Sequence, residues 1–291
     1  MKEISIVSGK GGTGKTTISG ALASLWKDKI MVDCDVDASN LHLLFNTVIK
    51  ETHEFYSGLK AHLDIQMCSQ CGECKKVCRF ESINSHYVID ELLCVGCGAC
   101  VLVCDTKAIK LHDNLAGYWF VSETPQGPLV HAALGIAEDN SGKLVAQIRM
   151  QSKEIAKRDK IKTIIIDGPP GIGCPVISAI TGVDLVLVVT EPSLSGLHDL
   201  QRIVALVNNF NIECCVCVNK YDINEKLSEE INNICISKGI EVVGNIPFSS
   251  QILKVISSAQ SCHSFFDKLP RDIKISIEKL QGLLFKKLTG L

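Results

Sequence analysis

The stretch GKGGTGKTT at residues 9–17 constrains the fold more than any other part of this 291-residue chain. It satisfies the pattern G-x-x-x-x-G-K-[ST], after the apolar run EISIV and before the helix-like run TTISGALASLWK. In this pattern backbone N–H groups cradle phosphate oxygens, the lysine reaches the β- and γ-phosphates, and the hydroxyl ligates Mg²⁺. We therefore predict a nucleotide site formed by Gly9, Gly11, Gly12, Thr13, Gly14, Lys15, Thr16 and Thr17.

Short apolar runs alternate with helix-like segments along the outer parts of the chain. Strands are expected at residues 3–8, 29–35, 161–167, 183–190, 213–219 and 240–247. Continuous apolar strands separated by helices are typical of a parallel sheet that is covered on both faces. The sequence therefore predicts a doubly wound α/β fold, which binds ligands outside the carboxyl ends of its strands.

Charge and composition narrow the classes of partner. The net charge is −2, so the protein has no overall positive electrostatic field that would attract nucleic acid. No apolar run reaches the length of about 18 residues that suggests a membrane span, and the first residues lack the features of a signal peptide. We expect a cytoplasmic protein without a nucleic-acid or membrane partner. In a reducing compartment, 15 cysteines indicate metal or redox chemistry rather than disulfides.

The loop carries a second lysine, Lys10, ahead of Lys15. With it, the motif resembles the deviant Walker A motif of the MinD/Mrp group of P-loop ATPases, which includes the nitrogenase iron protein. The resemblance implies an ATPase that dimerises with itself or a close paralogue, and in which Lys10 crosses the interface to the partner's nucleotide. There it would neutralise charge on the transferred phosphoryl group. The alternative is a loop lysine that stays in solvent.

Acidic residues at strand ends extend this resemblance. IMVDCDVDASNL resembles the group's switch I, which implies that Asp33 lies near Mg²⁺ and that Asp35 orients the attacking water. Asp37 is a weaker candidate for the second task. TIIIDGPPGIG resembles Walker B and switch II, so Asp167 would hold the Mg²⁺ shell through water. Carboxylates are the ligands that a hard, hydrated cation prefers.

The segment VNKYD bears on which nucleotide base is bound, adenine or guanine. Asn219, Lys220 and Asp222 satisfy the N-K-x-D pattern that GTPases use to recognise guanine. In the MinD/Mrp group, the Asn at this strand end contacts adenine and a later Pro, here Pro247, helps to hold the ring. The deviant loop outweighs the short pattern, so ATP is the expected nucleotide and GTP is the alternative.

Two cysteine runs interrupt the α/β pattern. CSQCGECKKVC and CVGCGACVLVC both read C-x₂-C-x₂-C-x₃-C, as in a bacterial ferredoxin with two [4Fe–4S] clusters. In such proteins the fourth cysteine of each run ligates the other cluster. The predicted ligands are Cys68, Cys71, Cys74 and Cys104 for one cluster, and Cys94, Cys97, Cys100 and Cys78 for the other. Two Cys₄ zinc sites are the alternative, although these usually show separated C-x-x-C pairs.

The cysteine pattern departs from that of ferredoxins at two positions. Arg79 and Asp105 stand where a proline normally follows the fourth cysteine, which puts cluster geometry and potential in doubt, but not ligation. Cys174, shortly after the switch II segment, is a weaker candidate for a third metal site. His131 is expected to be a packed residue rather than a ligand.

The resemblances together predict a P-loop ATPase domain at 1–61 and 113–291, with an inserted α+β ferredoxin-like module at 62–112. The main functional prediction is a dimeric ATPase that couples nucleotide state to electron transfer or to metallocofactor assembly. It implies an electron donor, an electron acceptor or a client protein as partner. The alternative is a positioning ATPase like MinD and ParA. The stripe of Ile277, Leu280 and Leu284, with lysines nearby, could then contact a membrane surface, or it could simply cover the sheet.

Overall fold

The computed structural model describes residues 1–257 and 265–290. The chain divides into two compact units. The first comprises Met1–Thr52, Trp119–Ala133 and Ser141–Leu291, and the second comprises His53–Tyr118 and Leu134–Asn140. The module predicted at 62–112 lies inside the second unit, which also takes in parts of the strands on either side of it.

Within the described residues, nine strands form one sheet in the order β3-β4-β5-β2-β6-β1-β7-β8-β9. Each pairing from β5 to β9 is parallel. These strands are β1 (Lys2–Ser8), β2 (Lys29–Asp33), β5 (Gly127–Leu134), β6 (Thr163–Pro170), β7 (Leu185–Thr190), β8 (Glu213–Asn219) and β9 (Glu241–Ile246). The predicted α/β fold with a mostly parallel sheet is confirmed.

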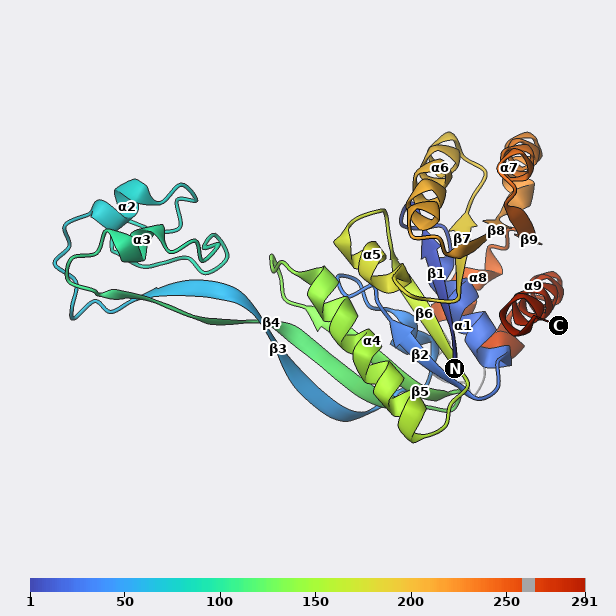
Figure 1. Ribbon diagram of the computed structural model, residues 1–291, viewed down its shortest axis with the longest axis horizontal. Helices are drawn as coiled ribbons and strands as arrows, with labels where there is room; N and C mark the ends of the chain where they lie inside the picture. The colour runs from blue at the N-terminus through green and yellow to red at the C-terminus, as the bar shows by residue number, and fades with distance from the viewer. Residues whose placement is uncertain (258–264, 291) are drawn as a thin grey trace. The chain divides into compact units, whose positions relative to one another are not determined.

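Helices cover both faces of the parallel part of the sheet (Figure 1). Helices α1 (Lys15–Leu25) and α9 (Arg271–Thr289) lie on one face, because buried side chains of both pack in one cluster with alternate residues of β1 and β7. Right-handed crossovers place the others on the opposite face: α4 (Ser141–Arg158), α5 (Cys174–Ile180), α6 (Leu194–Asn209) and α7 (Glu225–Ser237). Shorter elements are η1 (Leu41–Leu44), η2 (Tyr221–Ile223), α8 (Gln251–Ser257) and η4 (Phe266–Lys268).

The apolar stripe of α9 belongs to the core. Ile277, Leu280 and Leu284 are at most 1% exposed, so this stripe covers the sheet and is not available to a lipid surface. In the part of the chain that the structure describes, no helix is both long and apolar enough to cross a membrane.

Strands β3 (Val48–Leu63) and β4 (Ile109–Thr124) lead the chain into and out of the second unit. Neither strand is predicted from the sequence, because most of their side chains are polar or exposed and form no continuous apolar run. Only Pro125 and Gln126 separate β4 from β5, and a link this short joins antiparallel neighbours. The segment that follows the cysteine module therefore supplies the strand β5 to the sheet.

The two cysteine runs fold as matching halves of the second unit. Helices α2 (Glu73–Val77) and α3 (Ala99–Leu102) begin after Gly72 and Gly98, whose φ angles are 81° and 78°. Glycine adopts this left-handed conformation without the penalty of a Cβ atom. The sequence repeat is therefore also a repeat of local structure.

Candidate functional site

The phosphate loop connects β1 to α1 at the carboxyl edge of the sheet. Gly12 and Gly14 lie in the left-handed region, with φ of 79° and 87°. The φ of Gly14 is what requires glycine there, and a Cβ atom would in addition meet the side-chain nitrogen of Asn219. Lys15 is the first residue of α1. The loop thus presents the N–H groups of a helix start, which favour phosphate.

A cavity of about 410 Å³ extends from this loop to the ends of β8 and β9. Its volume falls in the range of small-molecule sites, roughly 300–1,000 Å³. The structure brings most predicted nucleotide residues to its wall: Gly11, Gly12, Thr13, Gly14, Lys15, Thr16, Thr17, Asp35, Asn219 and Pro247. Gly9 instead packs closely on the backbone of Asp199 in α6, where a Cβ atom would clash.

Lys15 lies among the predicted switch carboxylates. Its Nζ is 3.0 Å from Asp167 Oδ1 and 3.9 Å from Asp35 Oδ2. Burial alone would lower the pKa of Lys15, but Asp167, Asp33 and Asp35 outweigh it and raise that pKa. Ser19 Oγ also donates to Asp167 Oδ1 at 2.8 Å, a contact that the sequence analysis does not predict. The lysine therefore stays charged and neutralises an acidic site.

Asp33 organises the loop that follows β2. Four groups donate to its carboxylate: Asp35 N at 3.1 Å, Ser39 Oγ at 2.9 Å, Asn40 N at 3.0 Å and Leu41 N at 2.9 Å. Burial, with the negative charge of Asp167, raises the pKa of Asp33 to about 7. These contacts hold Asp35 at the cavity, whereas Asp37 is exposed. That Asp33 lies near Mg²⁺ stays a prediction.

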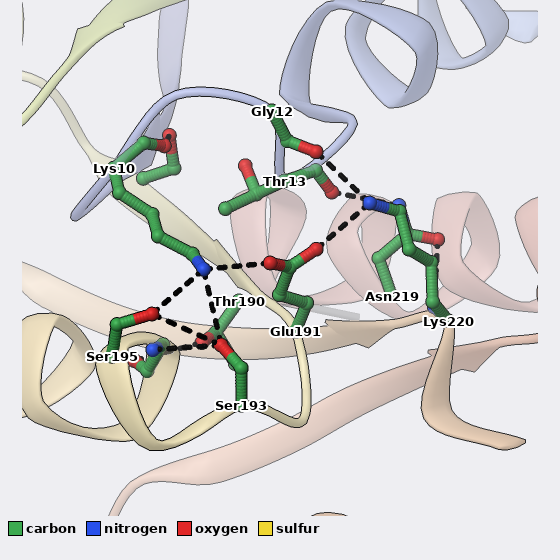
Figure 2. Close-up of polar contacts among 11 residues, drawn as sticks. Lys10, Gly12, Thr13, Thr190, Glu191, Ser193, Ser195, Asn219 and Lys220 are labelled. Carbon is green, nitrogen blue, oxygen red and sulfur yellow. Dashed lines mark hydrogen bonds and ion pairs between the residues drawn. The ribbon is translucent and has the colours of Figure 1, made fainter. Parts of the chain in front are cut away.

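Lys10 contacts the residues that follow β7 (Figure 2). Its Nζ lies 2.7 Å from Glu191 Oε1, 3.0 Å from Ser193 Oγ and 2.9 Å from Ser195 Oγ. None of these three partners is predicted from the sequence, because they lie far along the chain and belong to no motif. The contacts hold Lys10 within its own subunit, so it is not a lysine left in solvent.

The polar residues of VNKYD hold loops together at the other end of the cavity. Asn219 Nδ2 donates to Thr13 O at 2.7 Å, and Asp222 Oδ1 accepts from Phe248 N at 2.7 Å. Recognition of guanine needs the carboxylate as an acceptor for the base. One oxygen of Asp222 fixes the turn after Pro247, which lines the cavity. Its second oxygen is still an acceptor, so this contact does not choose between adenine and guanine, and ATP is expected from the resemblance of the phosphate loop.

Replacement of Lys15 by alanine should abolish ATP binding, because the phosphates lose their main cation. The unchanged protein should bind ATP at least about tenfold more tightly than GTP, a difference of about 1.4 kcal/mol. Isothermal titration with both nucleotides measures this, with Lys27→Ala, an exposed lysine after α1, as the control. A tenfold preference for GTP would show that Asp222 recognises guanine.

The predicted ligands of the first cluster gather around one small cavity in the second unit. Its lining includes all four: Cys68, Cys71, Cys74 and Cys104. Backbone N–H groups of Gln70 and Ala108 donate to Cys68 Sγ and Cys104 Sγ, each at 3.3 Å. Sulfur acceptors with N–H partners are the surroundings that a thiolate ligand needs.

The predicted ligands of the second cluster lie near one another as well. The pKa of Cys100 is raised by burial and then by the neighbouring thiols Cys94, Cys97 and Cys78. Ser82 Oγ lies 3.2 Å from Cys78 Sγ. However, in residues 1–257 and 265–290 no three Cys, His, Asp or Glu side chains converge as they would around a single metal ion. Among these residues the structure confirms neither the two clusters nor the alternative Cys₄ zinc sites.

Two candidates from the sequence remain, Cys174 and His131, and a metal site at Cys174 stays a prediction. Cys174 is exposed at the start of α5. His131 is packed, as predicted, because its ring stacks on those of His42 and Phe120 with centroids 5.0 Å apart. Its Nε2 lies 3.0 Å from Ser122 Oγ, and burial lowers the pKa of His131 to about 4. It stays neutral and in the core.

The phosphate loop after β1, with carboxylates ending the neighbouring parallel strands, defines a P-loop nucleotide-binding protein. The family described as the CobQ/CobB/MinD/ParA nucleotide binding domain matches residues 4–262. The chain belongs to this family, and the MinD and ParA members of the family are ATPases.

Known proteins agree with this assignment. Uncharacterized protein MJ0578 of Methanocaldococcus jannaschii is 36% identical over 289 residues, covering 98% of each chain. The septum site-determining protein MinD of Synechocystis is 25% identical over 260 residues, covering 86% of this chain and 77% of MinD. MinD of Pyrococcus horikoshii, solved with Mg-ADP, has the same fold, with a TM-score of 0.59 at 16% identity, covering 98% of this chain and 96% of that one.

These relatives bear differently on the two functional predictions. The named ones are septum site-determining proteins, so the alternative prediction, a MinD- or ParA-like positioning ATPase, fits better than the main one. Electron transfer and metallocofactor assembly receive no support from the comparisons.

Proposed function

We propose that this chain is an ATP-driven switch that dimerises around Mg-ATP, engages a partner in that state, and separates after hydrolysis. The observation that carries the proposal is the pair of lysines on one loop. Lys15 lines the cavity of its own subunit, whereas Lys10 projects away from it toward α6. A lysine so placed is suited to act on a second subunit's nucleotide.

The roles of the other residues follow from charge. Without nucleotide, Lys15 neutralises Asp167, whose Oδ2 makes no hydrogen bond within the described part of the chain. When Mg-ATP enters, Lys15 would turn to the phosphates, and the metal with its waters would replace it beside Asp167. Thr16 would ligate the metal, and Asp35 at the cavity wall would orient the attacking water.

Sedimentation velocity with Mg-ATP and with Mg-ADP tests this proposal. A dimer should form with ATP only, and a monomer under both conditions would contradict it. The MinD-like relatives suggest that the ATP dimer then engages a cell-positioning partner. Because the apolar stripe of α9 is buried, a protein partner fits better than a lipid surface. Co-sedimentation with anionic lipid vesicles separates these two partners.

We further propose that the second unit carries two [4Fe–4S] clusters. The supporting observation is that Cys68, Cys71 and Cys74 of the first run line one cavity together with Cys104, which comes from the second run. In a cubane each thiolate binds a different iron, so its ligands need not converge on one point. When bound, such clusters store and deliver single electrons. An electron donor, an electron acceptor or a metallocofactor client protein would then be a further partner.

Protein purified without oxygen should carry about eight iron and eight acid-labile sulfide per chain. Cys71→Ala should lose about half of both and destabilise the second unit, because ligation helps small metal domains to fold. Cys174→Ala is the matched control and should keep the full content. Elemental analysis and visible absorption measure the outcome. Stoichiometric zinc without visible absorption would rule out the clusters.

A further inference from the structure

Glu191 binds two lysines from two different loops (Figure 2). Its Oε1 accepts from Lys10 Nζ at 2.7 Å, and its Oε2 accepts from Lys220 Nζ at 2.8 Å. Lys220 Nζ also donates to Gly12 O in the phosphate loop, at 3.0 Å. One carboxylate therefore connects the lysine outside the cavity with a residue that lines it and with the loop between them.

Secondary structure fixes Glu191 in this position. It follows the last residue of β7, and the next turn is closed by Ser193, whose Oγ accepts from Gly196 N at 3.0 Å to cap α6. Thr190 Oγ1 donates to Gly196 O at 3.1 Å. A Cβ atom on Gly196 would collide with Glu191 O, so the turn is tightly packed. The carboxylate is thus held by the scaffold and does not depend on a flexible loop.

The environment of Glu191 strengthens both ion pairs. The side chain of Glu191 is 20% exposed, and those of Lys10 and Lys220 are 27% and 28% exposed. Although burial opposes it, hydrogen bonds from the two lysines lower the pKa of Glu191, so the carboxylate is charged at neutral pH. Partly buried pairs of this kind are less screened by salt than fully exposed ones.

We propose that Glu191 is a positioning residue that holds Lys10 inside its own subunit and opposes dimerisation until nucleotide disturbs the shared contact. The proposal rests on the proposed function, in which Lys10 acts on the partner's nucleotide. Lys10 cannot make that contact and keep Glu191 as well. Each subunit that enters the dimer must therefore break one Lys10–Glu191 pair.

Lys220 connects this restraint to the nucleotide. Lys220 lines the cavity near Asn219 and Pro247, and it holds Gly12 O beside the phosphate positions. A nucleotide in the cavity would contact Lys220 and the phosphate loop together. Glu191 pairs with both lysines, so any shift of Lys220 changes the strength of the ion pair between Glu191 and Lys10. Binding at one end of the cavity thereby loosens a lysine that lies outside it.

Glu191→Gln tests the restraint, because it keeps the shape and removes the charge. In nucleotide-free protein, acetic anhydride should label Lys10 about two- to fivefold faster than in the unchanged chain, as expected for losing a partly exposed ion pair. Mass spectrometry of the peptide measures this. With Mg-ATP, the dimer dissociation constant should fall roughly tenfold, because two pairs per dimer no longer need to break.

The matched control is Glu213→Gln, which removes the carboxylate that Lys287 contacts at 3.0 Å at the opposite end of the parallel strands. It should change neither the labelling of Lys10 nor dimerisation. Thermal unfolding of both variants verifies that they fold.

The outcomes separate the two proposals. If Glu191→Gln leaves Lys10 labelling unchanged, the restraint does not exist. If labelling rises and the dimer constant stays the same, while Lys10→Ala fails to dimerise, then Lys10 acts in trans but Glu191 does not oppose it. If Lys10→Ala dimerises normally, the proposed function itself is wrong and the inference falls with it.

Discussion

Replacement of Lys10 by alanine should leave the affinity for ATP nearly unchanged and remove both ATP-dependent dimerisation and most hydrolysis. The affinity persists because Lys15, not Lys10, lies at the cavity wall. Hydrolysis falls because the partner's nucleotide loses a cation that acts mainly on the transition state. Comparable cations supplied from a second subunit are worth roughly 10³–10⁵ in rate. Titration calorimetry, sedimentation velocity and a phosphate-release assay measure the three quantities.

Asp35→Ala supplies the contrast for this experiment. It removes the group proposed to orient water without removing a phosphate contact, so it should block hydrolysis and leave a long-lived ATP dimer. Lys27→Ala, which changes an exposed lysine after α1, is the control for loss of positive charge. A Lys10→Ala protein that dimerises and hydrolyses ATP at the normal rate would refute the trans role.

The sequence predicts the parts of the fold that are locally encoded. The strands β1, β7 and β8 appear as short apolar runs because both of their faces are buried. The phosphate loop is recognisable because the conformation of the loop itself determines which of its positions must be glycine and lysine. For the same reason the predicted residues from Gly11 to Thr17 all reach the cavity.

Other features depend on contacts between distant parts of the chain. Strand β3 has mostly exposed side chains, so it shows no apolar run, and its partner β4 comes after the whole cysteine module. The pairing of Glu191 with Lys10 likewise joins the start of the chain to a turn far along it. A single glutamate after a strand carries no motif. Only the parallel register, which brings the ends of β1 and β7 together, places it beside the phosphate loop.

Replacement of Arg149 by methionine should lower the free energy of unfolding by about 3–5 kcal/mol, the range for removing one partner of a buried ion pair. Arg149 on α4 is 6% exposed, and its Nη2 lies 2.7 Å from Glu3 Oε2 on β1. Its Nη1 also donates to Ser178 O and Thr181 O, at 2.6 and 2.9 Å. One guanidinium thus connects a central strand, α4 and the end of α5, and its loss leaves a buried carboxylate and two carbonyls without this donor.

A second variant identifies the cause of the decrease in the free energy of unfolding. Lys153 Nζ lies 2.8 Å from Glu3 Oε1 and compensates part of its charge, so the loss should fall near the lower end of the range. Glu3→Leu combined with Arg149→Met should be more stable than Arg149→Met alone, because it also removes the buried Glu3 carboxylate, which Lys153 compensates only in part. Arg158→Met is the matched control on α4: its guanidinium pairs with Asp159 at the surface, where water and salt screen the pair, so this variant should stay close to the unchanged protein in stability. Guanidinium denaturation followed by circular dichroism measures all three. Equal stability of Arg149→Met and Arg158→Met would show that the Glu3 contact is as weak as a surface pair.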